Sequence, residues 1–180
     1  MLYKEKYLKY KKKYIDLKKQ NIIKGGKPIY YFNDKNTHPG IWYVDLSDQS
    51  LINSIDNNFC IRCTNLRYIN LSPLSNVISI DRDFMLYCRS LKSINLSGLI
   101  QLETIGNFFM SGCTSLRSID LSGLTNLTSI NSFFMEGCIS LTSIDLSVLT
   151  KLENIELKFM DNCSSLTSID LYLLNLYNLP

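Results

Sequence analysis

The chain has 180 residues, and its hydrophobic content of 46% is sufficient for one domain with a continuous apolar core. Its net charge of +3 is unevenly distributed, because residues 1–27 contain ten lysines and two acids, whereas acids outnumber cations in the remainder. No apolar run approaches the roughly 18 residues of a membrane span, and the N-terminus lacks the apolar segment of a secretory signal. We therefore expect neither an integral membrane protein nor a secreted one.

Residues 1–20 are predicted to form a basic amphipathic helix, because good helix formers dominate the segment. Apolar and aromatic side chains recur at alternating intervals of four and three residues, so they lie on one stripe of the helix. They are Tyr3, Tyr7, Tyr10, Tyr14 and Leu17. The surrounding lysines could neutralise the phosphates of nucleic acid or the headgroups of anionic lipid. The alternatives are an oligomerisation stripe and a solvated helix that only flanks the next domain.

Residues 21–40 are predicted to be a linker followed by a segment that leads into the repeats. Gly25-Gly26 is typical of a flexible linker. A second interpretation of this pair is a processing site for a protease that cuts after two glycines. Asn, Asp, Pro and Gly are frequent between residues 28 and 40, so we expect turns there.

From residue 41 to residue 180 the sequence repeats every 25 residues, which indicates a solenoid. The copy F-M-S-G-C-T-S-L-R-S-I-D-L begins at Phe109, and F-M-E-G-C-I-S-L-T-S-I-D-L begins at Phe134. In S-I-D-L-S apolar and polar residues alternate, so we expect a short strand with one buried face. A shorter extended piece is expected at residues 127–130, and F-M-x-G-C predicts a turn or a single helical turn. Stacked coils then bury one another's apolar columns and pair their strands in parallel.

The pattern L-x-S-I-D-L-S-G-L-x-x-L-x-x-I, followed by F-M-x-G-C, resembles the leucine-rich repeats over residues 41–179. It is most similar to the bacterial-surface-antigen-like class. The fold implied by this resemblance is an α/β-type repeat solenoid with parallel β-sheets and about six 25-residue coils, preceded by the basic helix. The resemblance also implies a protein-interaction module and carries over no catalytic residue.

The N-terminal segment Y-K-E-K-Y-L-K-Y-K-K-K-Y-I-D-L-K-K-Q, with the following Gly25-Gly26, resembles a leader found on proteins of giant DNA viruses that infect amoebae. Together the two halves of the chain resemble a mimivirus-type leucine-rich-repeat protein. This resemblance implies an intracellular location, in the host cytoplasm or in the virion.

Five of the six cysteines occupy one column of the repeat. Because cysteine is among the most buried residue types, we expect this column to point inward as a structural ladder of free thiols. Its members are Cys63, Cys88, Cys113, Cys138 and Cys163. His38 lies one period before Cys63 and is expected to cap the ladder. Cys60 and Cys63 form a single C-x-x-C, for which thiol exchange or half of a zinc site is the alternative to two structural columns.

The outward-facing strand positions are the expected binding surface, and most of them hold Ser, Asn or Asp. Aromatic and basic residues interrupt this pattern towards the first coils, where we predict a recognition hot spot. Its residues are Trp42, Tyr43, Arg67, Tyr68, Lys92 and Arg117. Trp42 could instead plug the N-terminal end of the core. The stacked carboxylates of Asp120, Asp145 and Asp170 could attract a cation or a basic segment of a partner. The alternative is that they only keep this face of the sheet solvated.

No nucleophile–base set, phosphate-binding glycine loop or cleft-forming insertion is visible, so we expect no enzymatic activity, no cofactor and no metal. The predicted function is binding of an unknown protein partner, host or viral. One alternative is a structural or virion-associated protein that self-assembles through its last coil. The other is binding of nucleic acid or anionic lipid through residues 1–20.

Overall fold

The computed structural model describes residues 29–32, 41–46 and 52–170. Only the backbone is described for residues 29–32, 41–43, 45 and 168–170. The predicted basic helix, the Gly25-Gly26 linker and the proposed cap at His38 lie outside the described residues. Within the described part of the chain, no helix is long and apolar enough to cross a membrane.

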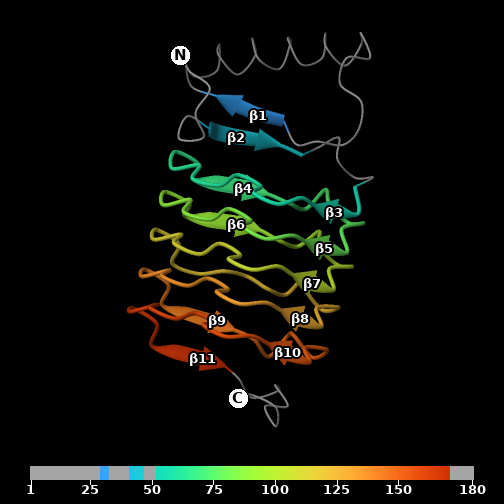
Figure 1. Ribbon diagram of the computed structural model, residues 1–180, viewed down its shortest axis with the longest axis vertical. Coiled ribbons are helices and arrows are strands. Elements are labelled where there is room, and N and C mark those ends of the chain that lie inside the picture. The colour runs from blue at the N-terminus through green and yellow to red at the C-terminus, as the bar shows by residue number, and fades with distance from the viewer. Residues whose placement is uncertain (1–28, 33–40, 47–51, 171–180) are drawn as a thin grey trace.

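The described chain begins with a hairpin that lies at one end of a stack of coils (Figure 1). Strand β1 (Ile29–Phe32) pairs antiparallel with β2 (Ile41–Asp45). β2 also lies against β4 (Tyr68–Asn70), which belongs to the coils. β1 falls in the segment for which the sequence predicts turns. The 25-residue pattern does not reach this segment, so no periodic signal marks the strand.

Successive coils each contribute a two-residue strand to one continuous parallel sheet. These strands are β3 (Ser54–Ile55), β5 (Ser79–Ile80), β7 (Thr104–Ile105), β8 (Ser129–Ile130) and β10 (Asn154–Ile155). Each strand of this sheet is paired with its neighbours in a register of 25 residues. The short extended piece predicted near residue 130 is therefore confirmed, and so is the register of the repeat.

The three-residue strands lie on the other side of the stack in Figure 1 and form two separate parallel pairs, β4 with β6 and β9 with β11. Their bounds are Tyr68–Asn70 for β4, Ser93–Asn95 for β6, Ser143–Asp145 for β9 and Ser168–Asp170 for β11. Residues 118–120, the equivalent stretch of the coil between β6 and β9, form no strand. The predicted binding sheet is therefore divided in two at this coil.

The predicted apolar columns form one core that runs through the stack. Its most regular feature is a phenylalanine column whose neighbouring rings are stacked, with centroids 5.0 to 5.3 Å apart. This column consists of Phe59, Phe84, Phe109, Phe134 and Phe159. Each aromatic pair contributes about 0.5–1.5 kcal/mol beyond the burial of its surface. The predicted core is thus confirmed for the described coils.

The F-M-x-G-C segment and the residue before it form a turn in which alternate residues have positive φ, as in Phe108 (61°), Met110 (52°) and Gly112 (71°). The N–H of Met110 donates to the carbonyl of Phe84 in the preceding coil at 2.8 Å, whereas Phe108 and Gly112 donate to the following coil. The alternation therefore directs successive N–H groups to opposite neighbours. Stacking then satisfies backbone groups that a single coil would leave unpaired.

Between residues 52 and 170 the coils consist of strands and turns, and this part of the chain contains no helix. The α/β type is therefore wrong for these coils, and so is the single helical turn offered as one interpretation of F-M-x-G-C. A helical turn would direct its N–H groups along its own axis. The alternating turn directs them along the stack instead, where the neighbouring coils accept them.

Candidate interaction surface

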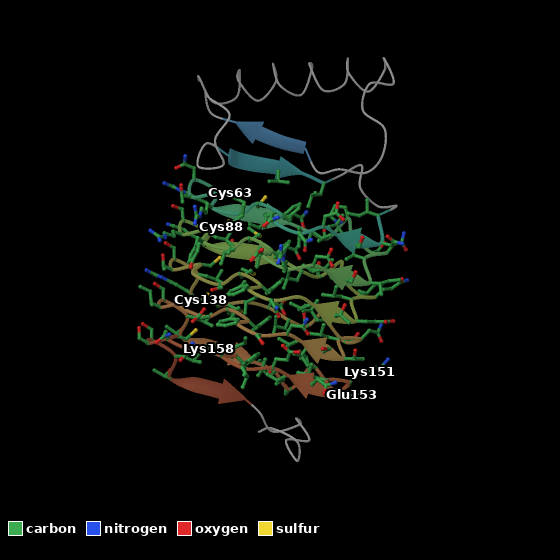
Figure 2. All side chains as sticks on the ribbon, in the orientation of Figure 1. Cys63, Cys88, Cys138, Lys151, Glu153 and Lys158 are labelled. Atoms are coloured by element: carbon green, nitrogen blue, oxygen red, sulfur yellow. The ribbon has the colours of Figure 1, made fainter. Side chains whose placement is uncertain are left out.

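The cysteine column is a hydrogen-bonded ladder inside the solenoid, and the labelled cysteines of Figure 2 follow one another along the stack. Cys113 Sγ donates to the carbonyl of Met85 in the preceding coil at 3.4 Å. The same bond measures 3.0 Å for Cys88, 3.3 Å for Cys138 and 3.2 Å for Cys163. Cysteine suits this position because it is small, apolar and still able to donate a weak hydrogen bond.

Burial makes these thiols poor nucleophiles. Desolvation raises the pKa of Cys138 to about 12, and burial also raises the pKa of Cys113 and of Cys60. The thiolate is the reactive form, so little of it is present at neutral pH. In the C-x-x-C both Cys60 and Cys63 are buried, and Cys60 stands where later coils have a buried methionine. Among the described residues, no group of three or more His, Cys, Asp or Glu could hold a metal ion.

The Asn and Asp column at the end of the longer strands closes a turn. Oδ1 of Asp120 accepts the N–H of Ser122 at 2.9 Å, and Asp145 accepts that of Ser147 at 2.8 Å. Asparagines at this position in earlier coils make the same bond at 3.0 Å. The bond from Ser122 lowers the pKa of Asp120. One acceptor oxygen is all that this turn requires, which explains why both Asn and Asp occur in the column.

Five exposed cations gather beside β4 and β6, and we name them the basic strip: Arg62, Arg67, Arg89, Lys92 and Arg117. Arg67, Lys92 and Arg117 occupy one column of consecutive coils, so their Cα atoms follow the spacing of about 4.8 Å between neighbouring strands. The N–H of Lys92 donates to the carbonyl of Arg67 at 2.9 Å, which joins two of these coils directly. None of the five cations forms an ion pair with a described residue.

Tyr87 organises the part of the strip that the sequence did not reveal. The Cζ atoms of Arg62 and Arg89 lie 6.0 Å and 5.7 Å from the centroid of its ring, which is the range of cation–π contacts. In the next coil the equivalent residue is Gly112, where an added Cβ would lie 2.3 Å from Cδ1 of Tyr87. The ring therefore lies over a glycine backbone. The available signal was that Arg62 and Tyr87 stand where the next two coils have glycine.

The charge of this corner of the solenoid changes sign along the stack. A corner segment runs from two residues before each ladder cysteine to five residues after it. The first three segments, residues 61–68, 86–93 and 111–118, hold five cations and no acid. The last two segments hold Glu136 and Asp161 and no cation, and we name this pair the acidic end. One face of the repeat thus carries a basic part followed by an acidic part.

The structure brings four of the predicted hot-spot residues together. Arg67, Lys92 and Arg117 belong to the basic strip, and Tyr68 follows Arg67 with 50% of its surface exposed. The carboxylates of Asp120 and Asp145 are exposed and engaged in turns, so a role in attracting a partner stays a prediction. Three predicted residues have side chains outside the described set, namely Trp42, Tyr43 and Asp170.

The family model "BspA type Leucine rich repeat region" matches the chain in six copies, over residues 30–102 and 84–177. The chain belongs to the BspA-type leucine-rich repeat family. This finding confirms the resemblance drawn from the 25-residue pattern. Leucine-rich repeats commonly mediate protein–protein interaction, and this family is a non-enzymatic repeat domain. No curated protein and no solved structure matches the chain significantly.

Proposed function

We propose that this BspA-type leucine-rich repeat protein is a non-enzymatic interaction module that binds a protein partner at the basic strip and Tyr68. The observation that carries the proposal is the contrast within single columns of the repeat. The column of Arg67, Lys92 and Arg117 continues as Thr142 and Thr167 in the later coils. Folding requires no charge at this position, so the charged part of the column is available for recognition.

The composition of the surface supports the same assignment. Arg and Tyr are enriched among the residues that dominate binding energy at interfaces, where their removal typically costs more than about 1 kcal/mol. Tyr87 is 39% exposed and Tyr68 is 50% exposed, so both present an apolar ring beside cations. The small serines that hold the column of Tyr68 in later coils offer far less contact area.

The test is affinity capture with the full chain and with a variant whose first coils carry the residues that the later coils have at the same positions. Arg67→Thr, Tyr68→Ser, Lys92→Thr and Arg117→Thr introduce the residues that these columns hold at positions 142, 143 and 167. We expect this variant to remain folded by circular dichroism and to lose the proteins that the wild type captures. Retention of every captured protein by the folded variant would contradict the proposal.

A matched control changes the opposite sheet by the same rule. Ile78→Thr, Ile100→Thr and Lys151→Asn introduce residues of the equivalent positions 128, 125 and 126. Ile78 and Ile100 are exposed apolar side chains, and Figure 2 shows Lys151 on the side of β10. We expect this variant to capture the same proteins as the wild type. Loss of capture in the control would place the binding surface on that sheet.

Self-association through the last described coil is a second candidate. Leu157 is 68% exposed, although its column holds polar residues or Arg in the earlier coils. Phe159 and Leu166 are only partly buried, whereas the preceding members of their columns are buried. Light scattering of the full chain and of Leu157→Asn tests this candidate. A monomeric wild type would count against it.

The proposal also includes an intracellular location and a giant-virus origin, which rest on the resemblance of the N-terminal segment. The location is supported by the six cysteines, which are all free thiols and would suit a reducing compartment. Nucleic-acid or anionic-lipid binding through residues 1–20 stays a prediction, since these residues lie outside the described part. Comparing the full chain with a chain whose leader lysines are changed to glutamine would test it.

A further inference from the structure

We propose that the partner segment which binds the basic strip is an extended acidic stretch of polypeptide, followed by neutral or basic residues that pass the acidic end. This inference rests on the proposed function and adds the chemistry of the partner and the order of its charges. Its observations are the charge of the strip, which no described residue neutralises by an ion pair, the arrangement around Tyr87 and the change of charge sign along the corner segments.

Tyr87 leaves the guanidinium groups next to it ready for carboxylates. The Cζ atoms of Arg62 and Arg89 lie within cation–π distance of its ring. Arginine commonly stacks on an aromatic ring through the flat face of its guanidinium group. The N–H donors lie in the guanidinium plane and are directed outward from its edge. A carboxylate can bind two of these donors at once, and such bidentate bonds are roughly twice as strong as neutral hydrogen bonds. The ring thus reduces the conformational freedom that binding would otherwise remove.

The dimensions of the strip suit a short extended peptide. Three consecutive coils place the Cα atoms of Arg67 and Arg117 about 10 Å apart, at about 4.8 Å per coil. Side chains on one face of an extended chain recur every two residues, or about 6.6 Å. Two or three acidic residues at alternate positions therefore span the strip. The long stems of arginine and lysine accommodate the remaining difference in spacing.

The surroundings of Tyr87 favour polypeptide over single-stranded nucleic acid. Binding of single strands relies on bases that stack on exposed aromatic rings. The Tyr87 ring is in contact with Arg62 from the preceding coil and lies against the backbone of Gly112 from the following coil. Neither neighbour leaves room for an inserted base without displacement. Although 39% of the Tyr87 surface is exposed, Arg62 and Gly112 lie next to its ring, so we assign Tyr87 to positioning the arginines.

The charge reversal along the corner segments sets the order of the charges that the partner presents along the stack. A uniform polyanion that continued past Arg117 would meet Glu136 and Asp161 in the next two corner segments. Like charges repel at the few ångströms of neighbouring coils, within the Debye length of about 8 Å at physiological salt. An acidic stretch followed by neutral or basic residues avoids this repulsion and gains attraction at both ends. Such reversed placement of charge is a common source of specificity.

The experiment measures fluorescence anisotropy of three labelled synthetic peptides against the full chain. The first carries three alternating glutamates followed by two lysines, the second has glutamine in place of glutamate, and the third continues with glutamates instead of lysines. We expect the first peptide to bind at least about ten-fold more tightly than the second and measurably more tightly than the third. Equal affinity for the first and second peptides would overturn the inference, and a tighter third peptide would overturn the proposed order of charges.

Two triple variants distinguish binding at the strip from nonspecific attraction of the peptide to the positive charge of the protein. The strip variant is Arg67→Thr, Lys92→Thr and Arg117→Thr, and it should weaken binding of the first peptide about ten-fold or more. The control variant also removes three cations and consists of Arg82→Asn, Lys151→Asn and Lys158→Asn. It should change the affinity by less than about two-fold. Equal effects of the two variants, or no effect of either, would place the binding elsewhere, for instance in the basic leader.

Two glycine variants test the role of Tyr87 without changing any charge. Gly112 and Gly137 have the same backbone conformation, with φ of 71° and 68°. A Cβ at Gly112 would collide with the Tyr87 ring, whereas a Cβ at Gly137 would meet nothing within 4 Å. We expect Gly112→Ala to weaken peptide binding several-fold and Gly137→Ala to leave it unchanged. Unchanged binding by a folded Gly112→Ala protein would remove Tyr87 from the site.

Competition distinguishes the inference from the proposed function. Adding the first peptide to the capture experiment should release the proteins that depend on the strip. If the strip variant loses captured proteins but the peptide neither binds nor competes, the interaction module stands and the acidic partner is wrong. Tighter strip-dependent binding of oligo-dT than of the peptide would assign the surface to nucleic acid. Self-association that Glu136→Gln with Asp161→Asn abolishes would assign it to a second copy of the chain.

Discussion

The basic strip and the acidic end lie in the same corner segment of different coils, although in different columns of the repeat, and they carry opposite charges. Around both of them the inward residues are alike, because each coil supplies a phenylalanine and a cysteine to the core. The coils that carry the strip have Arg or Lys where later coils have Thr, and Tyr68 where later coils have Ser. A residue that packs against two neighbouring coils must match both, whereas an outward residue need match neither. The comparison therefore separates what stacking requires from what recognition can use.

The largest expected effect is the loss of stability when a ring is removed from the phenylalanine column, and it should differ between two positions of unequal burial. Phe109 is fully buried between stacked rings, whereas Phe159 is only partly buried. Phe109→Ala should lower the free energy of unfolding by about 3–5 kcal/mol, and Phe159→Ala by about 1–3 kcal/mol. Urea denaturation followed by circular dichroism measures both. Equal losses would show that the last described coil is packed as tightly as the middle ones.

The next effect concerns the pair of glycines. Gly137→Ala should lower the free energy of unfolding by about 1 kcal/mol, because a residue with a Cβ is disfavoured at positive φ. Gly112→Ala should cost about 1–2 kcal/mol more, since the new methyl also displaces the Tyr87 ring. The double variant Gly112→Ala with Tyr87→Ala should recover that difference. Without such recovery, the ring would not be the cause.

A smaller effect separates the thiols by exposure. At pH 8 a thiol reagent should label Cys163, which is partly exposed, well before Cys113 and Cys138, as mass spectrometry of digests would show. The pKa of Cys138 rises from 9.0 to about 12 on folding. The folded state then holds this proton more tightly, so stability should decline as the pH rises from about 9 towards about 12. Rapid uniform labelling of all cysteines would contradict the buried ladder.

The smallest effect is electrostatic and lies in the turn column. The pKa of both Asp120 and Asp145 is lowered on folding, mainly by a hydrogen bond to Ser122 and to Ser147 respectively. Their contribution is therefore present above the unfolded value of about 3.9 and is lost as the pH falls through the folded pKa. Asp120→Asn with Asp145→Asn should keep the turns and flatten stability between about pH 4 and pH 2. An unchanged acid slope would show that other carboxylates dominate it.

The inward half of the repeat was predictable because it is strictly periodic. A column that holds the same apolar residue in successive coils is predicted to be buried. Leu66, Leu91 and Leu116 form such a column, and each of them is fully buried. The parallel register follows from the same period, since residues 25 positions apart must be opposite each other. The cysteine ladder was predictable in the same way. Its hydrogen bonds to the carbonyls of the preceding coil are visible only in the structure.

The outward half was predictable only in part. Arg67, Tyr68, Lys92 and Arg117 stood out because they interrupt columns of small polar residues. Arg62, Arg89 and Tyr87 were missed because they belong to a segment that was assigned to a turn or helical turn. Alternating positive φ in that turn brings residues of adjacent coils above one another, and periodicity alone does not show which side chains then meet. The break in the longer strands at residues 118–120 also has no counterpart in the sequence pattern.

By itself, the sequence determined the family, the period, the core columns and the register, because each is a consequence of repetition at 25 residues. Only the tertiary structure decided that F-M-x-G-C is an alternating turn, that β1 precedes the stack and that Tyr87 joins Arg62 and Arg89 over Gly112. The reason is physical. Burial acts on every copy in the same way and leaves a periodic trace, whereas a contact between non-equivalent side chains occurs once and depends on backbone geometry.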